Sequence, residues 1–149
     1  MILKIHSIFP AHINEIFKKL QEVKTLQYIS SPYASFVSEN PENKIWNVGK
    51  VKSFKLKIFG IISMGTHTIK VIKFSKNEIL TNECNKCVKV WNHKITLKKL
   101  NGSKTAYTDE IELKAGNYTP FVYLWAILFY KHRQKKWKNL LKHSENSLF

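Results

Sequence analysis

The chain has 149 residues, of which 44% are hydrophobic and 23% are charged. This length and composition predict one globular domain over residues 1–149 and argue against long disordered segments. The formal net charge is +15, yet Arg133 is the one arginine among 25 basic residues. Proteins that bind phosphate specifically favour the planar fork of arginine, so we interpret the lysines mainly as solvated surface and expect no specific nucleic-acid partner. An electrostatic attraction to nucleic acid or to an anionic membrane is the alternative.

The start of the chain alternates like a strand and lacks the apolar core of a secretory signal peptide. The longest apolar run, residues 121–130, is about half of the roughly 20 residues that a membrane-spanning helix needs. We therefore expect a cytoplasmic protein.

The N-terminal part of the chain mixes strand and helix patterns. Residues 2–9 are expected to form a strand, and Pro10 fits the first turn of a following helix, where its missing N–H is not needed. Apolar residues then recur at the spacing of an amphipathic helix: Ile13, Ile16, Phe17 and Leu20. A second short helix is expected over residues 22–29 and a strand over residues 33–37, before a polar loop at 39–43.

The middle of the chain has the pattern of a sheet. Alternating apolar and polar residues mark five successive strands: residues 50–59, 65–74, 78–84, 87–100 and 104–113. Tight connections, such as Asn101-Gly102 between the last two, predict an antiparallel meander. Together with the earlier strands, the sheet should have about six to seven strands.

The last part of the chain is a long helix that changes character along its length. A break at Gly116 precedes the helix, which opens at Thr119-Pro120 and continues to about residue 142. Residues 121–130 are apolar on nearly every side, and such a helix must be surrounded by protein or lipid, so we expect a curved sheet to wrap around it. Residues 131–138 are strongly basic, which suits the negative end of the helix dipole and also weak docking on an anionic membrane.

The order of these elements and several short motifs carry a resemblance to a known family. The motifs are Ile13-Asn14-Glu15-Ile16-Phe17, Trp91-Asn92-His93, Tyr107-Thr108-Asp109-Glu110-Ile111-Glu112-Leu113 and Phe129-Tyr130-Lys131-His132-Arg133-Gln134. With them, nearly the whole chain resembles the START-like helix-grip superfamily (SRPBCC) of polyketide cyclases, pollen allergens and lipid-transfer domains. The resemblance implies an α+β helix-grip fold with a deep apolar cavity between the sheet and the long helix. It implies no fixed activity, since members carry lipids, bind hormones or cyclise polyketides.

Four polar side chains fall on the predicted inward face of the strands: His67, Glu83, His93 and Asp109. Alternation places Glu83 less firmly than the others because its strand is short. Buried acids and imidazoles need partners, so we expect His–Asp or His–Glu pairs that orient a ligand or lock the core. Such pairs could also serve general acid–base catalysis, for which His93, Asp109 and Glu83 are candidates, although no catalytic residue is assigned. In the remaining alternative, the other set of alternating residues faces inward and these four groups lie at the surface.

The apolar lining predicted for the cavity comes from the long helix and from the sheet. The helix contributes one face: Phe121, Trp125, Leu128 and Phe129, together with His132. The sheet contributes the facing residues: Phe54, Leu56, Ile58, Ile69, Val71, Trp91, Ile95 and Ile111. The same stripes would also suit a plain packed core, but a polar minority within an apolar lining is typical of small-molecule sites.

Cys84-Asn85-Lys86-Cys87 is a single C-x-x-C motif at an expected strand–turn–strand junction. A structural zinc site needs further ligands at a fixed spacing, and a redox site usually places its first cysteine at a helix N-terminus. We interpret both thiols as incidental, with zinc and redox chemistry as alternatives, and we expect no metal and no cofactor.

The leading functional hypothesis is the binding or transport of a hydrophobic or amphipathic small molecule, such as a lipid, in the cavity. One alternative is an enzyme of the cyclase, dehydratase or hydrolase type on the same scaffold. The other is an electrostatic binder of an anionic membrane or of nucleic acid. The sequence indicates no oligomeric state.

Overall fold

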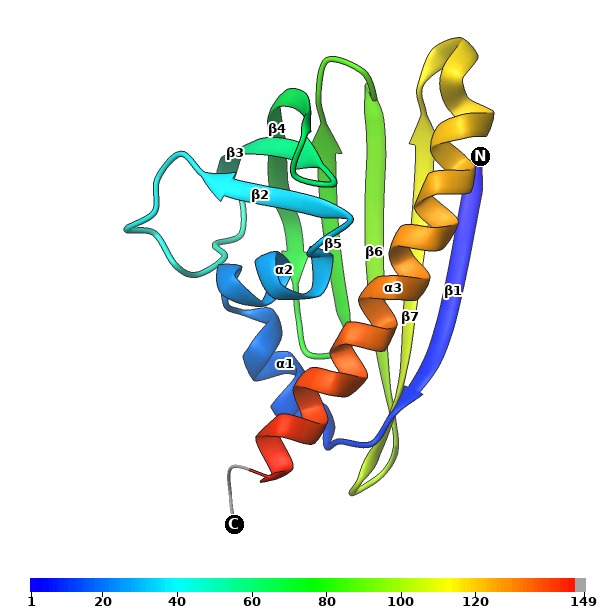
Figure 1. The fold of residues 1–149 in the computed structure, drawn as a ribbon. Coiled ribbons are helices and arrows are strands. Elements are labelled where there is room, and N and C mark those ends of the chain that lie inside the picture. The colour runs from blue at the N-terminus through cyan, green and yellow to red at the C-terminus, as the bar shows by residue number, and fades with distance from the viewer. Residues whose placement is uncertain (147–149) are drawn as a thin grey trace.

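A computed structural model describes residues 1–146, with side chains through residue 142 (Figure 1). The elements in chain order are β1 (Ile2–Phe9), α1 (Ile13–Leu20), α2 (Val23–Ser30), β2 (Ala34–Ser38), β3 (Val51–Ile58), β4 (Ile62–Phe74), β5 (Glu78–Cys84), β6 (Val90–Asn101), β7 (Lys104–Lys114), the 3-10 turn η1 (Gly116–Tyr118) and α3 (Thr119–Asn146). The α+β class, the two short helices after the first strand and the long C-terminal helix are all confirmed.

The strands form one seven-stranded sheet in the order β1-β7-β6-β5-β4-β3-β2. Every neighbouring pair is antiparallel. Strands β2 to β7 are therefore a continuous meander, as the short connections predicted, and β1 closes the far edge against β7. Register shifts between Lys55 and Lys57 and between Val71 and Lys73 insert bulges, which bend strands and increase their twist.

Helix α3 runs diagonally across one face of this sheet, and α1 and α2 lie beside its C-terminal half (Figure 1). Two core clusters result. One joins the N-terminal half of α3, through Ala126, Phe129 and Tyr130, to the middle of the sheet. The other joins its C-terminal half, through Trp137 and Leu141, to α1 and to the ends of β1, β6 and β7. Trp137 and Leu141 are the most deeply buried residues that α3 contributes to the second cluster.

The first helix starts later than expected. Pro10 lies outside it, and α1 begins at Ile13. The reason is the cap: His12 stays extended, and its Nδ1 accepts a hydrogen bond from the backbone N–H of Asn14 at 3.1 Å. An acceptor at this position satisfies one of the free N–H groups of the first turn, so the helix starts after His12 and not at the proline.

The apolar N-terminal half of α3 is not surrounded on every side, which corrects the expectation from its composition. Its outer face shows Leu124 and Leu128 at 61% and 58% exposure, and Phe121 near its start is 72% exposed. The sheet meets only the opposite side of the helix, where Ala126 and Phe129 are buried. In the described part of the chain no helix is both long and apolar enough to cross a lipid bilayer.

Two leucines of α3 offer a matched test of this arrangement. Leu141 is 1% exposed within the second core cluster, whereas Leu124 faces solvent. Leu141→Ala should lower the free energy of unfolding by about 2–5 kcal/mol, because it deletes buried methyl groups and leaves a cavity. Leu124→Ala should stay within about 0.5 kcal/mol of the parent protein. Urea denaturation followed by circular dichroism measures both, and equal losses would contradict the burial described for α3.

Candidate functional site

A cavity of about 1190 Å³ lies between the concave face of the sheet and α3. Its walls come from β2 to β6 on one side and from α2 and α3 on the other. Its mouth lies where the β5–β6 loop, η1 and the start of α3 meet, because exposed residues of these segments line it there: Lys86, Lys89, Tyr118 and Phe121.

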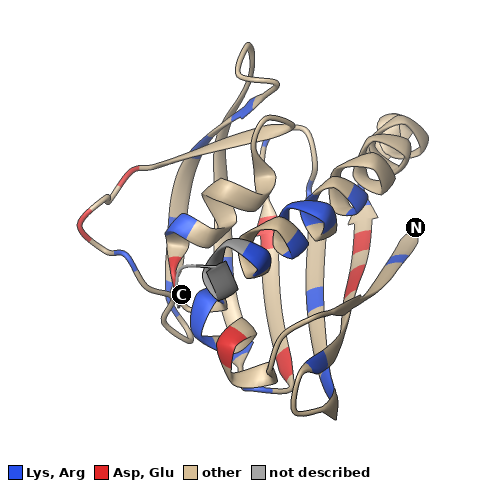
Figure 2. Cartoon of the chain, turned by 60° about the horizontal axis from the view of Figure 1, so that its bottom comes forward, with Lys and Arg blue, Asp and Glu red and all other residues tan. Residues whose placement is uncertain are grey.

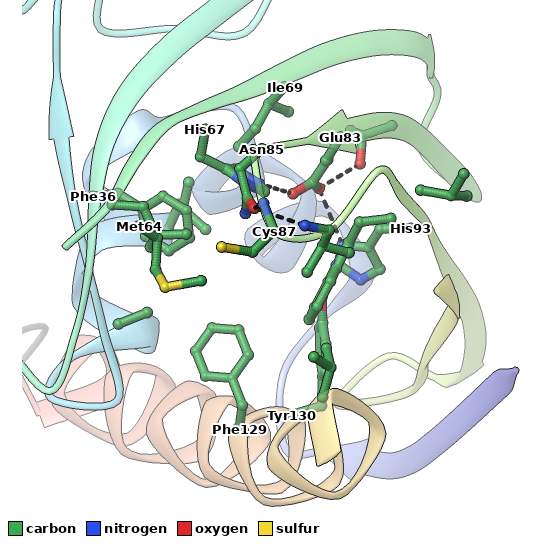
Figure 3. A pocket seen from close by; sticks show the side chains of 18 of the residues that line it. Phe36, Met64, His67, Ile69, Glu83, Asn85, Cys87, His93, Phe129 and Tyr130 are labelled. Carbon is green, nitrogen blue, oxygen red and sulfur yellow. Dashed lines mark hydrogen bonds and ion pairs between the residues drawn. The ribbon is translucent and has the colours of Figure 1, made fainter. Parts of the chain in front are cut away.

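Most of the residues predicted to bind a ligand line this cavity. They are Leu56, Ile58, His67, Ile69, Val71, Glu83, Trp91, His93, Ile95, Phe121, Trp125 and Phe129. Figure 3 shows Phe129 pointing from α3 toward the sheet, opposite Phe36 and Met64. The last two are lining residues that the analysis of the strands did not single out.

Four predicted lining residues are placed elsewhere. Phe54 and Ile111 point inward but are covered, with no exposed area, and Phe54 packs beneath Phe36 at 5.8 Å between ring centroids. Asp109 is buried behind His93. Leu128 lies on the outer face of α3. These four side chains do not line the cavity, because alternation and helical spacing give the direction of a side chain and not what covers it.

His132 was expected on the same helix face as Trp125 and Phe129. Its ring instead leaves the cavity and donates a hydrogen bond from Nε2 to the backbone carbonyl of Ser31 at 2.7 Å. It also lies 4.6 Å from the ring of Tyr33. His132 therefore ties α3 to the end of α2.

The sheet side of the cavity carries the polar cluster that the sequence predicted (Figure 3). His67 and Glu83, from the neighbouring strands β4 and β5, are joined by a 2.8 Å contact between Nε2 and Oε2. Thr81 donates a hydrogen bond to the other oxygen of Glu83 at 2.8 Å. The expected His–Glu pair is thus formed, and both of its side chains face the cavity.

Asn85 fixes the proton on His67. Its side-chain oxygen accepts the backbone N–H groups of Cys87 and Val88 at 2.8 and 2.9 Å, so its NH₂ group must be the part that faces His67 Nδ1, at 3.1 Å. Nδ1 is therefore an acceptor, and the ring proton is on Nε2, from which it is donated to Glu83. Both nitrogens of His67 are occupied within the protein.

A second pair lies deeper. His93 Nε2 contacts Asp109 Oδ1 at 2.7 Å, and the other oxygen of Asp109 accepts a hydrogen bond from Gln134 of α3 at 3.0 Å. His93 Nδ1 lies 3.9 Å from Glu83, too far for a hydrogen bond. Of the four ring nitrogens in the two histidines, Nδ1 of His93 thus lacks a hydrogen-bond partner among the described residues.

The surroundings of Glu83 act on its pKa in opposite directions. Burial alone would raise the pKa, because it disfavours the charged form. The hydrogen bond from His67, the positive charge that His67 and His93 carry when protonated, and the hydrogen bond from Thr81 lower it. The net pKa of Glu83 is below its ordinary value, so the carboxylate is ionised at neutral pH.

The helix side of the cavity adds two residues that the sequence analysis did not assign to the site. Tyr130 accepts a hydrogen bond from Trp91 Nε1 at 2.9 Å, and burial raises the pKa of its hydroxyl above the ordinary value. Arg133 is 6% exposed, and its guanidinium lies 4.9 Å from the ring centre of Tyr130. Both line the cavity. The signal in the sequence is the single arginine, which lies four residues after Phe129 on the same helix face within the basic run 131–138.

The two cysteines are free and exposed. Cys84 ends β5, and Cys87, in the loop that follows, lines the cavity (Figure 3). Across the described residues, no group of three or more His, Cys, Asp and Glu side chains has the arrangement of a metal site.

Comparisons with known proteins identify solved structures that have the same fold. No protein-family model matches the chain, and neither does any curated protein. Solved structures do. A START superfamily protein from Mycobacterium smegmatis has a TM-score of 0.71 at 14% sequence identity, covering 95% of this chain and 97% of its own.

Two further structures agree with this result. Protein CV1439 from Chromobacterium violaceum has a TM-score of 0.73 at 12% identity, covering 94% of this chain and 96% of its own. DynU16, from the dynemicin biosynthetic locus, has a TM-score of 0.64 at 12% identity, covering 95% of this chain and 47% of its own. At these identities the likeness shows the fold alone: the chain has the START-like helix-grip fold that its sequence motifs predicted.

The lowered pKa of Glu83 predicts a pH-dependent contribution to stability. A carboxylate with a depressed pKa stabilises the fold fully above its unfolded-state pKa of about 4.3, and this stabilisation is lost as pH falls through the lower folded pKa. Glu83→Gln, which removes the charge, should therefore reduce the free energy of unfolding at pH 7 by about 1–3 kcal/mol.

Urea denaturation of both proteins between pH 7 and pH 3 measures the difference. It should shrink below about pH 4.3 as Glu83 of the parent protein becomes protonated. Glu42→Gln, in an exposed loop, is the control and should show no difference at any pH. A Glu83→Gln difference that stays constant down to pH 3 would contradict the lowered pKa.

Proposed function

We propose that the protein binds a hydrophobic or amphipathic small molecule in the cavity between the sheet and α3. The observation that carries the proposal is the cavity itself, with about 1190 Å³ of space. Pockets of about 300–1,000 Å³ already bury most of a drug-sized ligand, so this one has room for a lipid or a polycyclic compound. Its walls combine large apolar side chains, such as Phe36, Leu56 and Phe129, with a few grouped polar ones, as small-molecule sites do.

The fold adds support by analogy. Proteins of the START-like superfamily carry lipids, bind hormones or cyclise polyketides, and one of the similar structures comes from a biosynthetic locus. These activities belong to those proteins and do not transfer with the fold. The ligand class proposed for this chain rests on the shape and lining of its own cavity. A cytoplasmic location stays a prediction from the sequence.

Catalysis on the same scaffold is the second candidate, and one contact favours it. Asp109 holds His93 through Nε2, as a carboxylate orients a histidine for proton transfer, while Nδ1 of His93 is unpaired among the described residues and the ring lines the cavity. This geometry could serve an acid–base step on a bound molecule. Binding remains the leading proposal because Glu83 and His67 are occupied with each other and with Thr81 and Asn85.

We further propose that the outer face of α3 docks on an anionic membrane while the cavity exchanges its ligand. The exposed apolar residues Leu124 and Leu128 are followed on the same face by the exposed lysines Lys131 and Lys135. Figure 2 shows lysines scattered over the strands as well as grouped along α3. An apolar stripe that continues into lysines suits insertion between anionic lipid head groups, and Phe121 brings this stripe to the cavity mouth.

The binding proposal predicts a measurable loss when the lining is truncated. Trp125 lines the cavity, whereas its neighbour Leu124 points outward. Trp125→Ala should weaken the binding of an apolar ligand by about 10- to 100-fold, because it removes a large buried contact, and Leu124→Ala should leave the affinity unchanged.

Fluorescence titration of protein stripped of bound molecules measures this effect, with dodecanol and a polycyclic aromatic compound as probes. Mass spectrometry of the recovered probe distinguishes the two candidate functions, since a carrier returns the probe unchanged and an enzyme converts it. If neither probe binds at up to millimolar concentration, the binding proposal is wrong.

The docking proposal predicts that vesicle binding depends on the stripe. The double variant Leu124→Ser, Leu128→Ser should bind phosphatidylglycerol vesicles about tenfold more weakly, because less apolar area enters the bilayer. Binding should also fall as salt is raised, since salt screens the lysines. Co-sedimentation measures both effects, and Val37→Ser, exposed on the edge strand β2, is the control. Equal binding to neutral and anionic vesicles would contradict the proposal.

A further inference from the structure

We propose that the ligand carries a carboxylate head group, which is held by Arg133 on the helix side of the cavity. This inference rests on the proposed function, because it names the chemical class of the molecule that the cavity binds. It starts from the single arginine of the chain, a residue with no part in the polar cluster of the sheet.

Arg133 is a buried cation with no anion in direct contact. Burial lowers the pKa of its guanidinium, but Tyr130 and the carboxylates of Asp109 and Glu83 raise it. The net pKa is above its ordinary value, so these acids act on Arg133 from a distance. Its side chain is 6% exposed, and no carboxylate oxygen of the described residues lies within 4.0 Å of its guanidinium. Its neighbours are the ring faces of Tyr130 and Phe129, at 4.9 and 5.5 Å. A buried charge is strongly unfavourable unless it is paired and hydrogen-bonded. An anion that bonds directly to this guanidinium can reach it from within the cavity that it lines.

The other unpaired polar groups on this wall are donors as well. Nε of Arg133 and Nε1 of Trp125 are buried and have no hydrogen-bond partner among the described residues. The oxygen of Tyr130 accepts from Trp91, while its own O–H has no acceptor in the same part of the chain. Three donors without an acceptor, all on residues that line the cavity, match a group that only accepts.

The sheet side offers the opposite situation. Glu83 and Asp109 hold hydrogen bonds from His67, Thr81 and Gln134, and neither lies within 4.0 Å of the Arg133 guanidinium. Their negative charges would also repel a second anion brought close to the sheet. A head group therefore belongs beside α3. Because one cation lies near two carboxylates of the protein, we expect the ligand's head group to carry a single negative charge. A carboxylate carries one negative charge, whereas a phosphate monoester carries more than one at neutral pH.

The spacing along α3 orients the rest of the ligand. Phe121, Trp125, Phe129 and Arg133 follow one another at four-residue intervals, and all of them line the cavity. Phe121 lies at the mouth, and Arg133 lies about 18 Å further along the helix axis at 1.5 Å per residue. The row of rings between them would cover an apolar chain or ring system. The ligand therefore lies with its carboxylate inward and its apolar part toward the mouth.

The test compares three amphiphiles with the same chain: dodecanoate, dodecanol and dodecyl phosphate. Isothermal titration of stripped protein should show dodecanoate bound about 10- to 100-fold more tightly than dodecanol, as a charge-assisted hydrogen-bonded pair provides. Arg133→Met, similar in length but uncharged, should remove this preference and leave the affinity for dodecanol within about threefold, because only the charge pair is lost. Lys131→Met, which removes an exposed charge from the same helix, should retain the preference.

Each other outcome has a distinct meaning. Equal affinity of the parent protein for dodecanoate and dodecanol overturns this inference and leaves the proposed binding function intact. Tighter binding of dodecyl phosphate than of dodecanoate overturns the assignment of a carboxylate. Binding of none of the three, nor of a polycyclic aromatic probe, overturns the proposed function itself.

Thermal unfolding with and without each ligand gives a second readout. Dodecanoate should raise the Tm of the parent protein more than dodecanol does, and Arg133→Met should abolish this difference, because a ligand that binds more tightly stabilises the folded state more. Equal Tm shifts from the two ligands in the parent protein would also overturn the inference.

Discussion

The width of the sheet is the constraint on which this structure depends. Seven strands at about 4.8 Å spacing extend over about 29 Å, whereas a helix with its side chains is about 10–12 Å across. One helix therefore cannot cover the concave face. Toward the C-terminal end of α3, the helix α1 fills the remaining width and packs around Trp137 and Leu141. Toward the N-terminal end of α3, the space left between the sheet, α2 and α3 is the cavity.

The same geometry separates the polar groups into two sets with different roles. The acids and imidazoles of the sheet are adjacent in register, so they satisfy one another: His67 pairs with Glu83, and His93 with Asp109. On the helix side, Gln134 donates to Asp109. By contrast, Arg133, Trp125 and Tyr130 keep donors that have no acceptor among the described residues. In the binding that we propose, the unpaired donors of α3 would orient a polar head group.

The fold could be predicted from the sequence because it depends on periodicity, and the seven strands and three helices each have a clear period. The inward direction of His67, His93 and Asp109 followed from the same alternation. Periodicity does not predict which inward-pointing side chains are covered by other residues and which line a cavity. Phe54 and Ile111 point inward but lie under other side chains, and Leu128 has helical neighbours in the cavity yet faces solvent. Arg133 was missed for a related reason, since a basic run reads as solvated unless the tertiary structure shows which member turns inward.

The pairing of β1 with β7 also governs how the molecule is made. Each of the strands β2 to β7 pairs with its immediate neighbour in sequence, so these local contacts can form as the chain is synthesised. Strand β1 must wait for a partner that follows it by roughly a hundred residues, which is about 5–20 seconds of synthesis at typical rates. During that interval Leu3 and Phe9, both buried in the finished fold, have no sheet to pack against. The first strand to leave the ribosome is thus the last to join the sheet, and a nascent chain stalled before β7 would display it to chaperones.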